Sequence, residues 1–321
     1  MRDYIFKRII TSIVMLIGVS IIIFTLVQLQ PGNPYSTMIS PTVSQDTVHK
    51  MLKDIGYYDP IWIKYIKWLG RVLHGDFGYS IQYKLPVLTV INSRIWNTFL
   101  LSIVSFIISS SIAILLGVIA ASKQNSIFDN ITTVVSFIGL SIPTFFFGLL
   151  LVKWLSFDVN LLPTSGMSTL GEDYTGIKAI IDVVRHMVMP VIVLSITQVA
   201  SLMRYTRSSM IDVLSQEYIR TARAKGLNKK LTIWKHGFRN SLISIVTILC
   251  MQLPSLFSGA LITETIFIWP GIGRLNYEAV VNRDYPLIMG ITMMLAILIV
   301  FSNLLADMLY AVIDPRIKIN K

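Results

Sequence analysis

The chain has 321 residues, of which 54% are hydrophobic and only 14% charged, and its mean hydropathy is +0.66. Soluble domains carry roughly 25% charged residues, so this composition excludes a water-soluble globular protein, a disordered chain and a disulfide-rich scaffold. A net charge of +11 at pH 7 first suggests nucleic acid as a partner, but the distribution of that charge argues against one. The single cysteine, Cys250, lies in an apolar run and is interpreted as a small buried hydrophobic residue.

Six stretches are long and apolar enough to cross a bilayer, which takes ~20 mostly apolar residues in a helix. The first is too long for the apolar part of a signal peptide and has no small-residue cleavage site, so we expect a retained anchor. The fourth is the weakest, because it is short and contains several polar side chains. The pattern predicts an all-α integral membrane protein without internal repeats. The predicted spans are 9–29, 98–122, 131–155, 188–205, 242–268 and 286–313.

The distribution of charge predicts the orientation of these spans. If the N-terminus is cytoplasmic, the cytoplasmic segments have a net charge of +11, whereas the longer outer loops have +1. Because Lys and Arg are retained on the cytoplasmic side, we predict a multi-pass protein of the cell membrane with both termini in the cytoplasm. The basic excess then faces anionic lipid and cytoplasmic partners, not nucleic acid. The cytoplasmic segments are 1–8, 123–130, 206–241 and 314–321, with Arg204 at the membrane edge, and the outer loops are 30–97, 156–187 and 269–285.

Segments outside the spans carry further predicted structure. The first outer loop is far longer than an ordinary connector of ~2–8 residues and has helical periodicity around Ile61–Leu73, which predicts a small folded cap. The Pro and Gly residues of Trp269–Gly273 predict a turn. The predicted domains are 1–97 (anchor helix and extracytoplasmic cap), 98–313 (transmembrane domain with the cytoplasmic loop 206–241) and 314–321 (cytoplasmic tail).

The stretch from Ser215 to Gly226 is predicted to form one short helix. Ser215 is the expected N-cap, and Glu217 lies in the first turn, where the helix dipole favours an anion. Gly226 can adopt the left-handed conformation that ends a helix. Asn228 is then placed to cap a second helix that continues to Phe238.

This short helix lies between two spans and can act as a mechanical handle for a soluble partner. Ala222 and Ala224 have small side chains, so another protein could approach the backbone closely. A basic loop that only sets topology is the alternative interpretation, because basic cytoplasmic loops are common.

The sequence from Glu217 to Gly226, EYIRTARAKG, resembles the EAA-type coupling segment of binding-protein-dependent ABC importer permeases. The resemblance is to the first permease subunit of the oligopeptide/dipeptide (nickel) class, and it continues along nearly the whole chain. Ser244, Asn33 and Tyr58 depart from the family pattern, which often has Pro, Asp and Leu there. The further matching motifs are Gln30–Pro34, Gly56–Pro60, Tyr65, Trp68–Leu69, Gly75–Ser80, Leu162–Gly166, Glu264–Gly273, Arg283–Pro286, Asn303–Leu304, Asp307 and Asp314–Arg316.

The resemblance implies a type I ABC importer fold and a set of partners. Those partners are a second homologous permease, two cytoplasmic ATPases and an extracytoplasmic substrate-binding protein. The chain has no phosphate-binding loop, so ATP and Mg²⁺ are expected on the ATPases and no cofactor on this chain. It also has no metal-ligand spacing and no nucleophile–base pair, so no metal or catalytic residue is assigned. The residues expected to contact the ATPase are Glu217, Tyr218, Arg220, Thr221, Ala222, Arg223, Ala224, Lys225 and Gly226.

The resemblance implies a pathway for oligopeptides or dipeptides, and importers of nickel or glutathione share the same pattern. An ion-coupled secondary transporter and a purely structural membrane scaffold are more remote alternatives. The first of these predicts paired hydropathy repeats and charges near the middle of the membrane, and neither is evident.

Polar residues inside the spans are candidates for the pathway because their burial in lipid is costly. Glu264 either lines the pathway or caps the Trp269–Gly273 turn. Asn303 and Asp307 share a helix face, either for a hydrogen bond between helices or for transport. Lys153 and Trp154 are interpreted as interfacial anchors. Three prolines in or next to spans, Pro143, Pro190 and Pro254, are either pathway bends or ordinary features of membrane helices.

Overall fold

The computed structural model describes residues 2–30, 45–54 and 56–313, and helices dominate this part of the chain. The Pro31–Pro34 and Asp314–Arg316 motifs and the predicted tail lie outside the described residues. The elements are α1 (Arg2–Gln28), α2 (Gln45–Asp54), α3 (Ile61–Leu73), α4 (Val87–Ser122), α5 (Ile127–Ser141), α6 (Thr144–Leu151), η2 (Val152–Asp158), α7 (Ile177–Leu214), α8 (Glu217–Ala224), α9 (Lys229–Leu231), η3 (Thr232–Phe238), α10 (Arg239–Gln252), η4 (Leu253–Leu256), α11 (Leu261–Ile266), α12 (Ile272–Val281) and α13 (Tyr285–Ile313).

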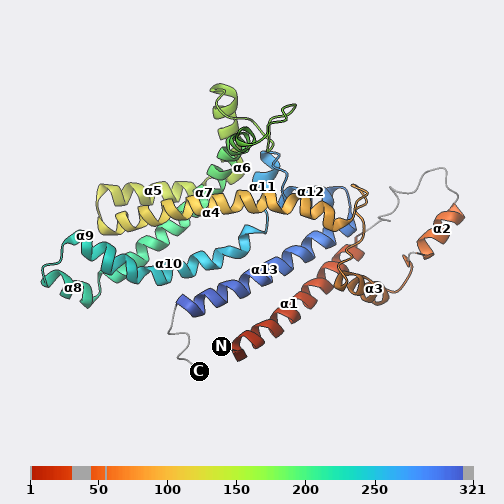
Figure 1. Cartoon of the computed structure of the whole chain (residues 1–321), viewed down its shortest axis with the longest axis horizontal. Coiled ribbons are helices and arrows are strands. Elements are labelled where there is room, and N and C mark those ends of the chain that lie inside the picture. Colours follow the sequence, from red (N-terminus) through yellow and green to blue (C-terminus); the bar gives the residue numbers. More distant parts are fainter. Residues whose placement is uncertain (1, 31–44, 55, 314–321) are drawn as a thin grey trace.

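Two long helices, α4 and α7, form the centre of the bundle and make its most extensive helix–helix contact (Figure 1). They have 36 and 38 residues, so each is about 55 Å long at 1.5 Å per residue, well beyond a hydrocarbon core of about 30 Å. The predicted spans 98–122 and 188–205 therefore cover only part of each helix. Helices α5 and α10 pack on α7, and α1 pairs with α13.

Within the described part of the chain, four helices are long and apolar enough to cross a membrane, or five if one bent pair counts as a single span. The four are α1, α4, α7 and α13. The bent pair is α5 with α6 and η2, and it turns by 99° at Pro143. Proline has no N–H and clashes with the preceding helical turn, so a helix ends before it. Figure 1 shows α6 rising out of the bundle after this bend.

The predicted fifth span, 242–268, is not one continuous helix. It consists of α10, the short 3-10 turn η4 with Pro254 near its start, and α11 after a non-helical stretch. Of the two interpretations of Pro254, the structure therefore has the bend, because a proline without an N–H ends the regular helix of α10 there. By contrast, Pro190 lies within α7, which continues through it.

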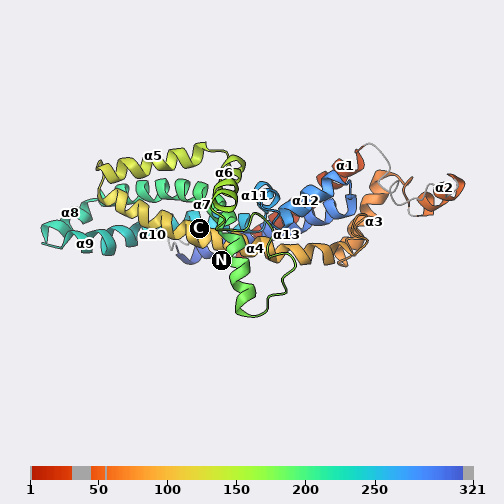
Figure 2. The same ribbon diagram turned by 90° about the horizontal axis from the view of Figure 1, so that it is seen from above.

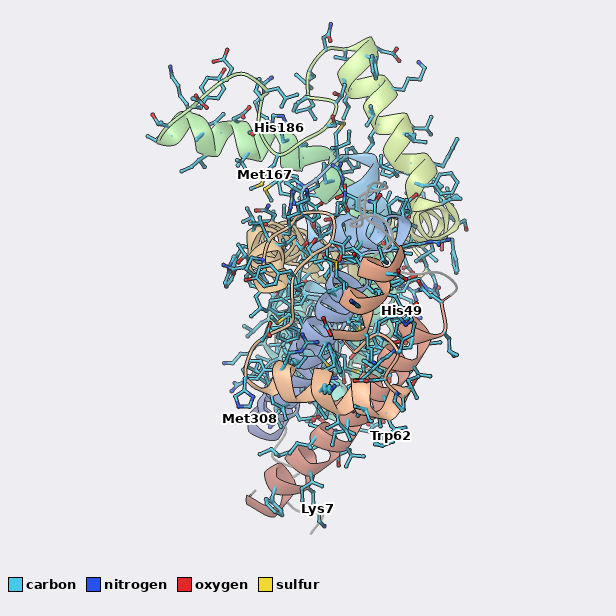
Figure 3. The ribbon with its side chains drawn as sticks, turned by 90° about the vertical axis from the view of Figure 1, so that its right-hand side faces the viewer. Lys7, His49, Trp62, Met167, His186 and Met308 are labelled. Atoms are coloured by element: carbon cyan, nitrogen blue, oxygen red, sulfur yellow. The ribbon has the colours of Figure 1, made fainter. Side chains whose placement is uncertain are left out.

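The predicted cap contains α2 and α3, and α3 begins and ends at the predicted residues, Ile61 and Leu73. Trp68 of α3 is buried against Phe24 of α1 and against Tyr285 and Met289 of α13. This cluster attaches α3 to the ends of two spans. Figure 3 views the molecule from this end, with His49 on α2 and Trp62 on α3.

Candidate coupling segment

Helix α8 lies at one extreme of the molecule, where α7 ends and α9 begins. Figures 1 and 2 both place α8 and α9 at the opposite end of the long axis from α2 and α3. The two segments that the sequence singled out, the short basic helix and the cap, are therefore separated by the whole bundle.

One narrow face attaches α8 to the bundle. Ile219 and Ala222 are buried, and α8 packs against η3. The spacing of three residues puts both side chains on the same side of the helix. The remaining members of the predicted coupling set are exposed: Glu217, Tyr218, Arg220, Thr221, Arg223, Ala224, Lys225 and Gly226. Of the two alanines expected to admit a partner, only Ala224 faces outward.

The ends of α8 are largely as predicted. Gly226 has φ +79°, the left-handed conformation expected just after the helix. The Asn228 side chain accepts a hydrogen bond of 2.9 Å from the Lys230 amide, which confirms it as the cap of the second helix. Ser215 as N-cap is wrong. Its hydroxyl donates to the carbonyl of Asp212 at 2.8 Å, because Ser215 belongs to the end of α7 and Gln216 precedes α8.

The charges on α8 are held only by neighbours within the helix. Arg220 donates to Glu217 at 3.0 Å, and both side chains are 79% exposed. An exposed pair of this kind contributes little to stability, so both groups are available to a partner. Partial burial raises the pKa of the Tyr218 phenol above its usual value.

A largely buried ion pair that the sequence analysis did not predict joins the last part of α7, which leads into α8, to the start of α5. Arg207 of α7 donates two hydrogen bonds, of 2.5 and 2.7 Å, to the two carboxylate oxygens of Asp129 in the first turn of α5. The Asn125 amide also donates to Asp129, at 2.9 Å. This pair fixes the α4–α5 turn to the last part of α7. The signal available in the sequence was an isolated acid at a helix start and an isolated Arg beyond an apolar span.

Glu264 is fully buried at the opposite part of the bundle, and its carboxylate is held by donors from three segments. The Thr98 hydroxyl and the Ala260 amide donate to one oxygen at 2.9 and 3.2 Å, and the Arg274 amide donates to the other at 2.9 Å. A Cβ at Gly271 would overlap this carboxylate. The geometry is that of the turn-capping alternative, because the side chain closes the loop between α11 and α12.

Asn303 and Asp307 lie on α13 facing the start of α1. Asp307 forms an ion pair of 3.1 Å with Arg8. Both residues line a cavity of about 350 Å³ together with Arg8, Thr11 and Ser12. This polar contact joins α1 to α13 near their ends.

The other candidate groups contact their near neighbours. Lys153 forms an ion pair of 2.8 Å with Asp158, and Trp154 is exposed, as an interfacial anchor would be. Among the described residues, no three or more His, Cys, Asp or Glu side chains are grouped so that they could hold a metal ion.

Family models match almost the full length of this chain. Residues 113–319 match the model described as "Binding-protein-dependent transport system inner membrane component". Residues 1–104 match the model for the N-terminal part of the same kind of membrane component. The two matches meet within α4.

Curated relatives are similar to the chain from end to end. The oligopeptide transport system permease protein AppB of Bacillus subtilis strain 168 is 43% identical over 99% of this chain and 100% of its own length. The dipeptide transport system permease protein DppB of Escherichia coli strain K12 is 37% identical over 100% of both.

A solved structure shares the fold. The MetNI methionine ABC transporter, in inward facing conformations, contains a chain that superimposes with a TM-score of 0.52 at 14% identity, over 71% of this chain and 97% of that one. This likeness supports a type I ABC importer permease fold for the transmembrane part.

Proposed function

The chain belongs to the family of binding-protein-dependent transport system inner membrane components, and from this premise we propose that it is a permease subunit of a peptide-importing ABC transporter. The observation that carries the proposal is α8, a short helix with a largely exposed polar surface at one end of the spanning bundle. Full-length relatives that are permeases of oligopeptide and dipeptide transport systems support it.

We propose that the chain crosses the membrane six times with both termini in the cytoplasm. The bent pair of α5 with α6 and η2 makes the third crossing, and α10, η4 and α11 together make the fifth. Helix α10 has 14 residues, or about 21 Å, so alone it is too short for a hydrocarbon core of about 30 Å. The excess of Lys and Arg at the α8 end supports this orientation.

In this proposal α8 is the contact for a cytoplasmic ATPase. The side chains of Glu217 and Arg220 are exposed toward the partner, while Ile219 and Ala222 hold the helix to η3. The α9–η3 segment and the Asp129–Arg207 pair give α8 a rigid base, so a displacement of α8 moves α7 and α10 with it. The ATP and Mg²⁺ are bound by the ATPases, because this chain has no phosphate-binding loop.

Transport then requires the ATPase to hold α8 differently in its two states. A partner that bound both conformations of the permease equally would shift no equilibrium. We propose that ATP binding brings two such coupling segments together and opens the pathway toward a loaded binding protein. A second homologous permease supplies the other coupling segment.

The break in the fifth span is the proposed element of the pathway in this chain. Ser255 and Ser258 are exposed on either side of Phe257, and regular helical hydrogen bonding is interrupted there. Non-helical backbone at membrane depth is tolerated only where it is buried in protein or lines a polar cavity. Glu264 instead supports this break through the Ala260 amide.

The substrate class follows the relatives, which are oligopeptide and dipeptide permeases. Peptide length is set mainly by the extracytoplasmic binding protein in such a system, and the bilayer and this protein are the remaining partners. The ligand carried by that binding protein would identify the substrate directly.

The test is copurification and uptake in cells that express the whole importer. We propose that Glu217 pairs with a basic group of the ATPase. Glu217→Lys should then reduce copurification of the ATPase at least about tenfold and abolish ATP-dependent peptide uptake, because two like charges at an interface cost several kcal/mol. Its control for copurification, Glu172→Lys, makes the same charge change in the exposed 159–176 loop. Normal ATPase recovery and uptake with Glu217→Lys would contradict the proposal.

A further inference from the structure

A cavity of about 760 Å³ opens between α8 and the end of the transmembrane bundle. Its walls come from the α4–α5 turn, the last part of α7, α8 and the start of the α9–η3 segment. We propose that this cavity binds the phosphate-bearing headgroup of an anionic phospholipid. The lining residues are Ala121, Ser122, Lys123, Gln124, Asn125, Ser126, Ile211, Leu214, Ser215, Arg223, Leu227, Lys229 and Ile233.

Three cations from three separate segments line the cavity, and no carboxylate does. Lys123 follows α4, Arg223 is on α8 and Lys229 begins α9. Of the acids nearest along the chain, Asp129 is paired with Arg207 and Glu217 with Arg220, while Asp212, next to Ile211, is exposed and does not line the cavity. Like charges that converge without a counter-ion repel each other, and a bound anion relieves that repulsion.

Hydrogen-bond donors and a helix terminus stand on the same side of the cavity. Asn125 and Ser126 form the turn before α5, and Ser126 is its N-cap. Helix α5 has 15 residues, so its partial positive charge is directed toward the turn. The Asn125 backbone amide already donates to Asp129, so a phosphate oxygen near this turn would meet the Asn125 side-chain amide and the Ser126 hydroxyl in addition to the cations.

The apolar part of the lining decides between ligands. Ile211 and Leu214 at the end of α7 are half-buried and pack beside the buried Ile233 of η3, and the exposed parts of these side chains suit the glycerol and first acyl carbons of a lipid. Inorganic phosphate would leave this apolar part uncovered. A lipid headgroup satisfies both halves of the cavity, and basic pockets between helices on the cytoplasmic side attract anionic lipids.

A bound headgroup would link the α4–α5 turn to the α8–α9 region, which face each other across the cavity. A phosphate between Lys123 and Lys229 joins the α4–α5 turn to the base of α8. The lipid would then hold α8 in one orientation relative to the bundle. This consequence does not depend on which substrate the importer carries.

The experiment compares two double variants of the assembled importer. Lys123→Gln with Lys229→Gln removes two cations of the cavity. The matched control, Lys230→Gln with Lys235→Gln, removes the same charge from exposed positions on α9 and η3 outside the lining. Complexes in neutral detergent are titrated with short-chain phosphatidylglycerol and, separately, with phosphatidylcholine and with inorganic phosphate.

Phosphatidylglycerol should bind the cavity variant about ten- to thirtyfold more weakly than wild type, since each Lys contributes about a factor of five. The control should bind like wild type, and phosphatidylcholine weakly to all three. A phosphatidylglycerol with a photoreactive group near its phosphate should label residues 121–126 or 223–233 of the wild-type complex, which keeps the test valid if a variant folds poorly.

Three results would overturn the proposal. Equal affinity of both double variants for phosphatidylglycerol would show that the cavity is not its site. Displacement of the lipid by millimolar inorganic phosphate would show a free-phosphate site. Loss of the ATPase subunit from the cavity variant, with lipid binding unchanged, would show that the cavity belongs to the ATPase contact.

Discussion

Two acidic residues that the sequence singled out, Glu217 and Glu264, have opposite environments. Glu217 on α8 is 79% exposed and contacts one Arg three residues away. Glu264 is fully buried and accepts from the Thr98 hydroxyl and two backbone amides. Both lie in motifs that resemble family motifs, yet the first presents its charge to solvent and the second holds three chain segments together.

The difference shows that acidic residues in two family-like motifs can have different physical roles. At α8 the physical cost of the charge is low, because water solvates it until a partner binds. At Glu264 the carboxylate is stable only because donors surround it, and removing it would leave those donors unpaired. Substitutions at the α8 end should therefore impair transport without unfolding the protein, whereas those inside the bundle should unfold it.

The largest effect is expected from Glu264→Leu. The Arg274 and Ala260 amides and the Thr98 hydroxyl would lose their acceptor in a dry site, which costs about 3–5 kcal/mol of unfolding free energy. Cys250 is buried, so a thiol-reactive dye reports thermal unfolding of the purified chain. Glu264→Gln keeps an acceptor oxygen and should lose less. Equal unfolding midpoints for Glu264→Leu and wild type would refute the assigned role.

A somewhat smaller loss is expected from Arg207→Leu. It leaves the Asp129 carboxylate buried with an amide donor but no cation, at a cost of about 2–4 kcal/mol, reduced because Arg207 is 27% exposed. Combining it with Asp129→Asn removes the stranded charge and should recover part of the loss. Additive effects of the two substitutions in the same dye assay would show that they do not interact.

Gly226→Val tests the α8 end of the molecule, the exposed half of this comparison. A β-branched residue at φ +79° costs about 1–2 kcal/mol, and only the turn after α8 bears that strain. We expect peptide uptake to fall strongly while the thermal unfolding midpoint changes little. Gly226→Asn should restore much of the uptake, because Asn tolerates the left-handed conformation. A large fall in the unfolding midpoint would show that α8 is part of the stable core.

Local patterns in the sequence predicted local structure well. The period of apolar residues gave the bounds of α3, and the turn chemistry of Gly226 and Asn228 gave the end of α8 and the start of α9. Each of these depends on a few neighbouring residues. The predicted Trp269–Gly273 turn is confirmed in part, since 269–271 connect α11 to α12 but Ile272 and Gly273 already belong to α12.

Features that depend on distant residues were not predicted. The Asp129–Arg207 pair joins residues 78 positions apart. The sequence shows them only as single charges in two different predicted cytoplasmic segments. Pro254 indicated a bend as one of two alternatives, but a hydropathy average over 242–268 does not show where the helix stops, because the broken segment remains apolar. The Glu264 carboxylate accepts a hydrogen bond from Thr98 of another helix, and no local pattern specifies this contact.

The smallest effect is expected at Tyr83, whose side chain is half-buried, between the exposed Glu217 and the fully buried Glu264. Its hydroxyl donates to Glu278 at 2.9 Å, and burial followed by this carboxylate raises the pKa of the phenol. Tyr83→Phe should cost about 1 kcal/mol at neutral pH. As the pH rises above about 10, the unfolded state loses the phenolic proton before the folded state does. The extra unfolding free energy of the wild type therefore falls and is lost as the pH passes the raised pKa of the folded state. Unfolding midpoints from about pH 8 to about pH 11 should therefore converge for the two proteins, and a constant difference would mean that this hydroxyl is not held by Glu278.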